Sequence, residues 1–162
     1  MEETIIAPVE RDLLAAELTP ERKLRTTNKG GNEIYVVTYH QAPNVLREIG
    51  RLREKYPDKK FEDDEEIYGQ IGEDYDLDES DVCEHPYYQL IVWNPASSEI
   101  LGGYRFLPGA EAAFDQSGQP ILATSHLFHF SDEFLRDYFP RTVELGRSFV
   151  TLEYQSSRAM TK

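Results

Sequence analysis

The stretch YYQLIVWNPASSEILGGYRFLP, residues 87–108, contains two runs of β-branched and aromatic residues separated by a short polar segment. Residues 87–95 predict a strand and residues 100–108 a second strand, with the ASSE segment as the turn between them. The two strands are expected to pair as a hairpin. We further expect this hairpin to lie in one sheet, next to a strand predicted at 143–154.

Upstream of the hairpin, residues 32–40 predict a strand and residues 42–56 a helix that Pro57 ends. The apolar residues of the helix that follow helical spacing are Val45, Leu46, Ile49 and Leu52. The segment LTPERKL predicts a short helix that begins after Thr19, with proline at its first position. We assign residues 1–31 to an N-terminal extension and residues 32–162 to the main domain.

Downstream of the hairpin, residues 131–140 predict a helix capped by Ser131, and residues 143–154 predict the last strand. The resulting order is strand, helix, acidic segment, two strands, loop, helix and strand. This order predicts an α/β (α+β) fold with a mixed, mainly antiparallel sheet flanked by helices.

Composition limits the function classes. The chain has 162 residues and a net charge of −13, which argues against binding to nucleic acid. No apolar run approaches the roughly 18 residues of a transmembrane helix, and the N-terminus MEETIIAPVERDLL lacks the apolar core of a signal peptide. We expect a cytoplasmic protein, peripheral at a membrane at most. Cys83 is the only cysteine, and no metal site is predicted, since His126 and His129 lack a third ligand.

Acidic residues are concentrated at 60–85. The simplest interpretation of such a run is a solvated loop. A calcium loop is not predicted, because Asp76, Asp78 and Asp81 have the wrong spacing for an EF-hand and lack its distal glutamate.

The last predicted strand, VELGRSFVTLEYQ, carries Glu144 and Arg147 within an apolar run. In a regular strand the two side chains would point to opposite faces. A β-bulge near Gly146 would shift the alternation and allow them to meet. Two interpretations stay open: a pair that only satisfies its own buried charges, or a general base held by an arginine.

Short charged motifs precede the last strand. Leu52 and Arg53 form a Leu–Arg pair near the end of the predicted helix. Asp76, Asp78 and Asp81 form an acid-x-acid-x-x-acid triplet. In YRFLP, an arginine, Arg105, precedes a Leu-Pro turn.

The ELGR segment adds a Glu-Leu-x-Arg motif formed by Glu144 and Arg147. In order and rough spacing, these motifs resemble those of the acyl-homoserine-lactone synthases and of the N-acyltransferases of ornithine- and glycine-lipid synthesis, many of which carry a haemolysin label. The lipid-synthesis branch is the better match, through ELGRSFV and QLIVWNP. The resemblance covers roughly residues 32–158. An aromatic residue expected one turn after Arg53 is replaced by Pro57, so the edge of an acyl pocket is expected to differ.

The resemblance implies the first half of a GNAT-like acyltransferase fold and transfer of a long acyl chain to the amine of a small amino acid. The donor would be an acyl-phosphopantetheine thioester on an acyl carrier protein, with no permanently bound cofactor. It implies catalytic roles for Glu144 and Arg147, with an acyl tunnel against the last strand. The implied substrate-binding residues are Arg53, Asp76, Asp78, Asp81 and Arg105.

The sequence ends at Lys162, before the loop and helix that hold the phosphopantetheine in the family. The alternative hypothesis is therefore an incomplete or non-catalytic GNAT-like domain that acts as a binding or assembly module. It predicts self-association, as a homo-oligomer, through residues 147–155.

Overall fold

The computed structural model describes residues 5–56 and 75–155. The chain divides into two compact units. The first, here called the sheet unit, comprises Met1–Arg105 and Arg147–Lys162. The second, here called the aromatic unit, comprises Phe106–Gly146.

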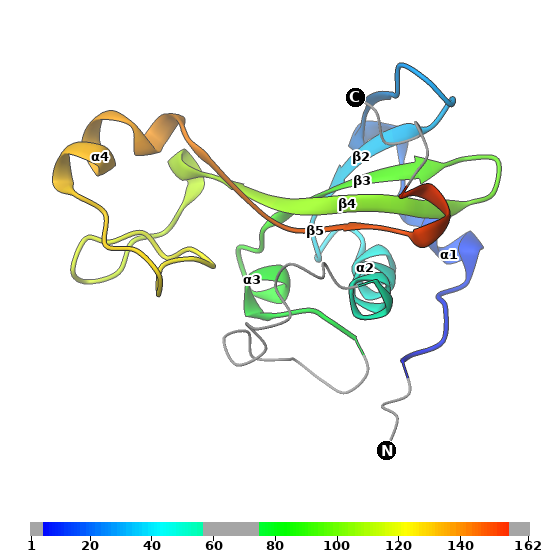
Figure 1. Ribbon diagram of the computed structural model, residues 1–162, viewed down its shortest axis with the longest axis horizontal. Helices are drawn as coiled ribbons and strands as arrows, with labels where there is room; N and C mark the ends of the chain where they lie inside the picture. The colour runs from blue at the N-terminus through cyan, green and yellow to red at the C-terminus, as the bar shows by residue number, and fades with distance from the viewer. Residues whose placement is uncertain (1–4, 57–74, 156–162) are drawn as a thin grey trace. The chain divides into compact units, whose positions relative to one another are not determined.

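The described strands form one sheet in the order β1-β2-β3-β4-β5 (Figure 1). They are β1 (Lys23–Thr26), β2 (Glu33–Val37), β3 (Tyr88–Asn94), β4 (Glu99–Pro108) and β5 (Val143–Val150). β2 pairs with β1 and with β3 in antiparallel fashion, with Tyr35 opposite Ile91. The predicted hairpin and its place beside the last strand are confirmed. The last strand is shorter than predicted, because it ends at Val150 and a 3-10 turn, Leu152–Tyr154, follows it.

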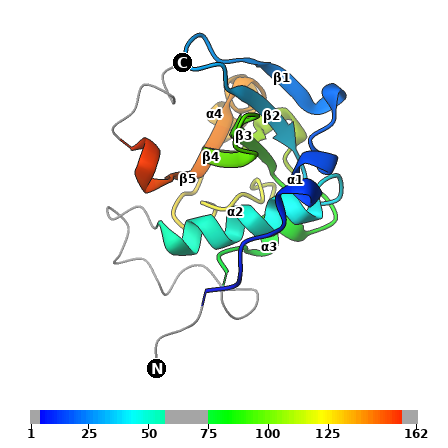
Figure 2. The ribbon, with the colours of Figure 1, turned by 90° about the vertical axis from the view of Figure 1, so that its right-hand side faces the viewer.

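The described part of the chain contains four α-helices: α1 (Arg11–Glu17), α2 (Pro43–Lys55) and α3 (Glu79–Val82) in the sheet unit, and α4 (Asp132–Asp137) in the aromatic unit. α2 and α3 lie on the same face of the sheet, as Figures 1 and 2 show. The predicted cap of α4 is confirmed, since the Ser131 hydroxyl accepts a hydrogen bond from the Phe134 amide at 3.2 Å. No helix in the described ranges is long and apolar enough to cross a membrane.

The N-terminal segment contributes more to the sheet unit than its polar sequence predicted. The helix expected after Thr19 is a single 3-10 turn, Pro20–Arg22, because the chain enters β1 at Lys23. The preceding helix α1, which was not predicted, buries Leu14. Residues 1–31, expected to be an extension, therefore supply a helix and an edge strand.

Contacts between α1 and α2 fix the first turn of α2. The residue at the N-cap of α2, Ala42, has no side-chain oxygen to accept a hydrogen bond from the amides that follow it. Glu17 of α1 replaces it, and its carboxylate accepts hydrogen bonds from the amides of Asn44 at 3.1 Å and Val45 at 2.9 Å. The start of α2 is thus fixed by a residue that lies 27 positions before Asn44 in the sequence.

The core of the sheet unit lies between α2 and the sheet. The predicted apolar face of α2 is buried in it, together with alternate residues of the strands. Its buried members include Val45, Leu46, Ile49, Leu52, Tyr35, Val37, Ile91, Trp93, Ile100 and Phe149. Phe149, which belongs to the segment 147–155 expected to mediate self-association, is therefore a core residue.

The aromatic unit is built around α4 and the loop before it. The ring of Phe130 stacks on that of Phe134 with centroids 5.5 Å apart, and Phe139 packs against both. Gln119 stabilises the loop through two hydrogen bonds. Its Nε2 atom donates to the Phe130 carbonyl, and its Oε1 atom accepts from the Phe130 amide.

Candidate active site

Arg53 enters the site from the last turn of α2. Its side chain is buried because the residue lies on the helix face that packs against the sheet. Its Nη1 atom donates to Oδ2 of Asp81 at 2.9 Å, and its Nη2 atom donates to Oε1 of Gln89 at 2.8 Å. Gln89 in turn donates to Oδ1 of Asp81 at 2.7 Å. A buried arginine, aspartate and glutamine therefore form a closed ring of hydrogen bonds.

Asp78 and Asp81 belong to the start of α3, where they occupy the N-cap and N3 positions. The Asp78 amide donates to Oδ2 of Asp81 at 3.2 Å, as in a capping box. Negative side chains are favoured there by the free amides and the dipole of a helix start. Local structure thus places two carboxylates under the sheet, so the interpretation of the whole acidic run as a solvated loop is wrong for this part.

Arg105 reaches the same carboxylates from β4. Its Nη1 atom donates to both carboxylate oxygens of Asp78, at 2.7 and 2.8 Å, and to Oδ2 of Asp81 at 3.2 Å. Its guanidinium also lies over the ring of Tyr87, with 5.2 Å between Cζ and the ring centroid. Arg105 is thus paired with two acids of the aspartate triplet.

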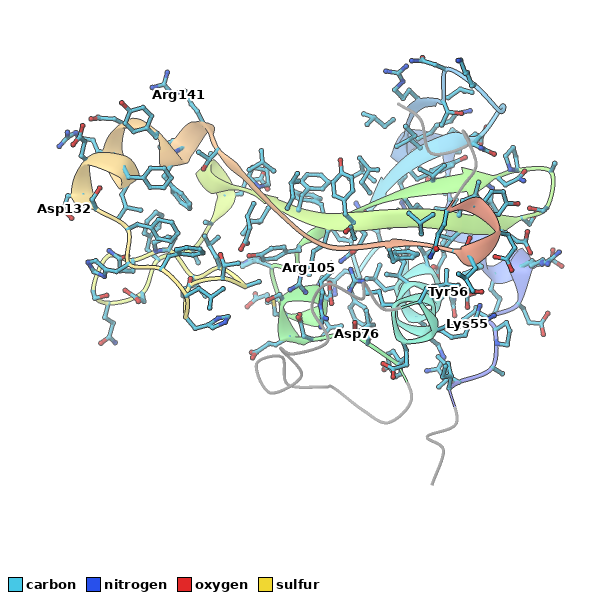
Figure 3. The ribbon with its side chains drawn as sticks, in the orientation of Figure 1. Lys55, Tyr56, Asp76, Arg105, Asp132 and Arg141 are labelled. Carbon is cyan, nitrogen blue, oxygen red and sulfur yellow. The ribbon has the colours of Figure 1, made fainter. Side chains whose placement is uncertain are left out.

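Asp76 pairs with Arg147 of β5. The Nη2 atom of Arg147 donates to Oδ1 of Asp76 at 2.6 Å and lies 3.8 Å from Oδ2 of Asp78. In the view of Figure 3, Arg105 lies between the strands and α3, and Asp76 lies between α3 and α2. Three arginines and three aspartates from four separate segments therefore form one network, here called the Arg–Asp network (Arg53, Arg105, Arg147, Asp76, Asp78 and Asp81).

A glycine in α2 positions the segment that carries Asp76. The Asp76 amide donates to the carbonyl of Gly50 at 3.0 Å, so the segment lies directly on the helix. A Cβ atom at position 50 would lie 2.7 Å from the ring of Tyr75 and 2.9 Å from Cγ of Leu77. Glycine costs helix stability in an interior position, and here it allows the close approach that orients Asp76.

The partly buried carboxylate of Asp76 and the buried carboxylate of Asp81 differ in their acidity. Burial raises the pKa of Asp76 above its ordinary value, although Arg147 and Arg53 oppose this shift. Burial acts in the same direction on Asp81, but the charges of Arg53 and Arg105, together with hydrogen bonds from the Asp78 amide and Gln89, lower the pKa of Asp81. Asp81 is therefore the fully compensated anion of the network, and Asp76 is the under-compensated one.

The predicted irregularity of the last strand is confirmed at Arg147. Up to position 146, the less exposed residues of β5 are the even-numbered Glu144 and Gly146. From position 147 on, the odd-numbered Arg147 and Phe149 are less exposed than Ser148 between them. Arg147 has a φ of +51°, in the left-handed region that non-glycine residues seldom adopt. The alternation of the strand therefore shifts by one residue between positions 146 and 147.

Glu144 lies in the aromatic unit, where Thr124 contacts its carboxylate. The Thr124 hydroxyl donates to Oε1 of Glu144 at 2.6 Å and the Thr124 amide donates to the same atom at 3.2 Å. These two hydrogen bonds orient the Glu144 carboxylate. That Arg147 holds Glu144 in place for catalysis stays a prediction.

All five residues expected to bind substrate, together with Arg147, meet in the Arg–Asp network; their roles stay predictions. Sequence reasoning missed Gln89, whose amide links Arg53 to Asp81. The available signal was strand parity, since Gln89 shares a face with the core residues Ile91 and Trp93. A polar residue on the buried face of a strand requires a hydrogen-bond partner in the core.

Comparison with known proteins identifies the family. A family model described as acetyltransferase (GNAT) domain matches residues 60–162. A protein of Bacteroides thetaiotaomicron named glycine N(alpha)-acyltransferase is 59% identical over 160 residues, which are 99% of this chain and 45% of that protein. A protein of Phocaeicola vulgatus with the same name is 57% identical over 160 residues, 99% of this chain and 47% of that protein.

The chain thus spans less than half the length of these relatives. A search of solved structures found no significant match. The family-model match covers more than half of the chain, including the aspartate triplet, Arg105 and the Glu-Leu-x-Arg motif. It follows that this chain belongs to the GNAT acetyltransferase domain family.

Proposed function

We propose that this chain takes part in N-acyl transfer from an acyl carrier protein thioester to the amine of glycine, as a step in lipid synthesis. The observation that carries the proposal is the Arg–Asp network, in which Arg53, Arg105 and Arg147 each pair with a member of the aspartate triplet. The names of the two relatives suggest glycine as the acceptor.

The chemistry requires a nucleophilic amine and a base. The amine nitrogen attacks the thioester carbonyl carbon, the C–N bond forms and the C–S bond breaks. The proton lost by the nitrogen passes to the base, and the phosphopantetheine sulfur leaves and takes up a proton as the thiol. We assign the base to Glu144, whose carboxylate Thr124 orients. An acyl tunnel against β5 remains part of the proposal.

The test is a direct assay of transfer. The purified chain is incubated with a long-chain acyl carrier protein and glycine, and N-acylglycine is measured by mass spectrometry. Ornithine in place of glycine distinguishes the acceptor, and acyl-coenzyme A in place of the carrier protein distinguishes the donor. Formation of N-acylglycine from the carrier protein supports the proposal. Absence of any N-acylated amino acid with either donor contradicts it for this chain.

A further inference from the structure

The Arg–Asp network divides into a sealed part and an open part. The side chains of Arg53 and Asp81 are 3% and 0% exposed, and that of Arg105 is 2% exposed. The side chains of Arg147 and Asp76 are 24% and 19% exposed. Within the described network, a small molecule from solvent can therefore reach the Arg147–Asp76 pair, but not the pairs behind it.

The open pair is held in place from both sides. Asp76 is fixed by the hydrogen bond from its amide to Gly50, and the carboxylate of Asp78, 10% exposed, lies 3.8 Å from the guanidinium of Arg147. Arg147 is presented by the single left-handed residue at the break in β5. An unusual backbone conformation persists only where the surrounding structure holds it, and such residues are concentrated at functional sites. Two opposite charges are thus presented side by side in a fixed geometry.

A small amino acid is complementary to such a pair. It carries an ammonium group and a carboxylate joined through one carbon atom. Guanidinium groups bind carboxylates through charge-assisted hydrogen bonds, and carboxylates bind ammonium groups in the same way. We propose that Asp76 and Arg147 form the recognition site for the head group of the acceptor amino acid, with Asp76 toward the ammonium and Arg147 toward the carboxylate. This inference rests on the proposed N-acyl transfer.

The state of Asp76 supports this assignment. Among the described residues its carboxylate accepts one side-chain hydrogen bond, from Arg147 to Oδ1, which leaves Oδ2 for a ligand. The raised pKa of Asp76 shows that Arg147 and Arg53 together do not offset the cost of burying its charge. A bound ammonium would add the missing positive charge. Asp81, whose pKa is lowered, has no such deficit.

The experiment compares ligands that differ in one charged group. Binding of glycine and of glycinamide, which lacks the carboxylate, is measured on the purified 162-residue chain by saturation-transfer NMR. The wild type is expected to bind glycine about 10-fold or more tightly than glycinamide, as expected for one charge-assisted contact. R147Q is expected to abolish this preference, R147K to retain most of it, and D76N to weaken both ligands. R136Q is the matched control, because Arg136 forms an exposed pair with Asp137.

Two results would overturn the inference. One is that the wild type binds glycine and glycinamide equally, or binds neither. This result would reject the recognition site even if R147Q does not fold. The other is an R147Q variant with wild-type thermal midpoint and an unchanged preference for glycine. Neither result bears on whether N-acylglycine forms in the transfer assay. Conversely, glycine-selective binding without any transfer would retain the recognition site and reject the proposed function.

Discussion

Arg53 and Asp81, 28 positions apart in the sequence, meet at 2.9 Å with almost no exposure of either side chain. Two ions taken out of water at such a distance stabilise a fold only where further hydrogen bonds satisfy them. Gln89 and Arg105 supply those bonds to Asp81. The sealed part of the network is therefore expected to be sensitive to the loss of any single member.

Arg105→Ala should lower the free energy of unfolding by about 3–5 kcal/mol, because it leaves the carboxylate of Asp78 buried without its main partner. The measurement is urea unfolding followed by circular dichroism. Arg136→Ala is the matched control, since its pair with Asp137 is exposed and should contribute about 1 kcal/mol at most. Equal effects of the two substitutions would show that the network is not energetically buried.

Gly50→Ala should destabilise the chain by about 1–3 kcal/mol, because the new methyl group would meet Leu77 and Tyr75 at less than contact distance. Helix propensity alone predicts the opposite sign, a gain of about 1 kcal/mol. The measurement is again urea unfolding, combined with the amide chemical shift of Asp76. A more stable variant with an unmoved Asp76 amide would contradict the close approach of the two segments.

Tyr35→Phe should make stability less sensitive to alkaline pH. Burial, together with a hydrogen bond to Glu33, raises the pKa of Tyr35 to about 12. The folded state therefore retains this proton more tightly than the unfolded state, whose tyrosine pKa is about 10. The associated stabilisation is complete below pH 10 and is lost as the pH rises towards 12. Unfolding free energies at pH 9, 10 and 11 should fall more steeply for the wild type than for the variant; parallel slopes would refute this.

Ser98→Gly should stabilise the β3–β4 hairpin by up to about 1 kcal/mol, because Ser98 has a φ of +54° that glycine adopts without a steric cost. Ser97→Gly is the control at the neighbouring turn position. It should destabilise by about 0.5–1 kcal/mol through the greater freedom of the unfolded chain. Thermal unfolding monitored by circular dichroism gives both values, and destabilisation by both substitutions would contradict the assigned backbone conformation.

Glu144→Gln should reduce the rate constant of N-acyl transfer by about 100-fold or more, if the proposed function holds, since an amide cannot accept the amine proton. The KM for glycine should change little, because the proposed head-group contacts come from Asp76 and Arg147. Glu133→Gln, which removes an exposed acid of α4, is the control. A Glu144→Gln variant with the wild-type rate constant would remove Glu144 as the base.

Much of the fold was predictable because its signals are local. The strands on either side of the turn at residues 95–98, the helix that ends before Pro57 and the cap at Ser131 each depend on neighbouring residues. Helix α1 and strand β1 were not predictable in this way. The polar sequence of β1 reflects its position at the sheet edge, and Leu14 gains its burial from distant parts of the chain.

The candidate site was predictable in membership but not in connectivity. The motifs identified Arg53, Arg105 and the aspartate triplet, and burial of an arginine in β4 required an anionic partner. The pairing of each aspartate with its arginine depends on the close approach at Gly50 and on the break in β5. Local sequence does not determine either feature. The division between sealed and open pairs emerges only from the packed structure.

Helix α3 has four residues, far fewer than the roughly 12–15 that an isolated helix needs to be even marginally stable in water. Its first-turn carboxylates are bound by arginines of α2 and β4, which lie 24–28 positions away. The helix can therefore persist only after those two elements have assembled around it, which places it late in folding. Hydrogen exchange at the amides of Asp81 and Cys83, both bonded within this turn, should accordingly follow the opening of the sheet and not local fraying.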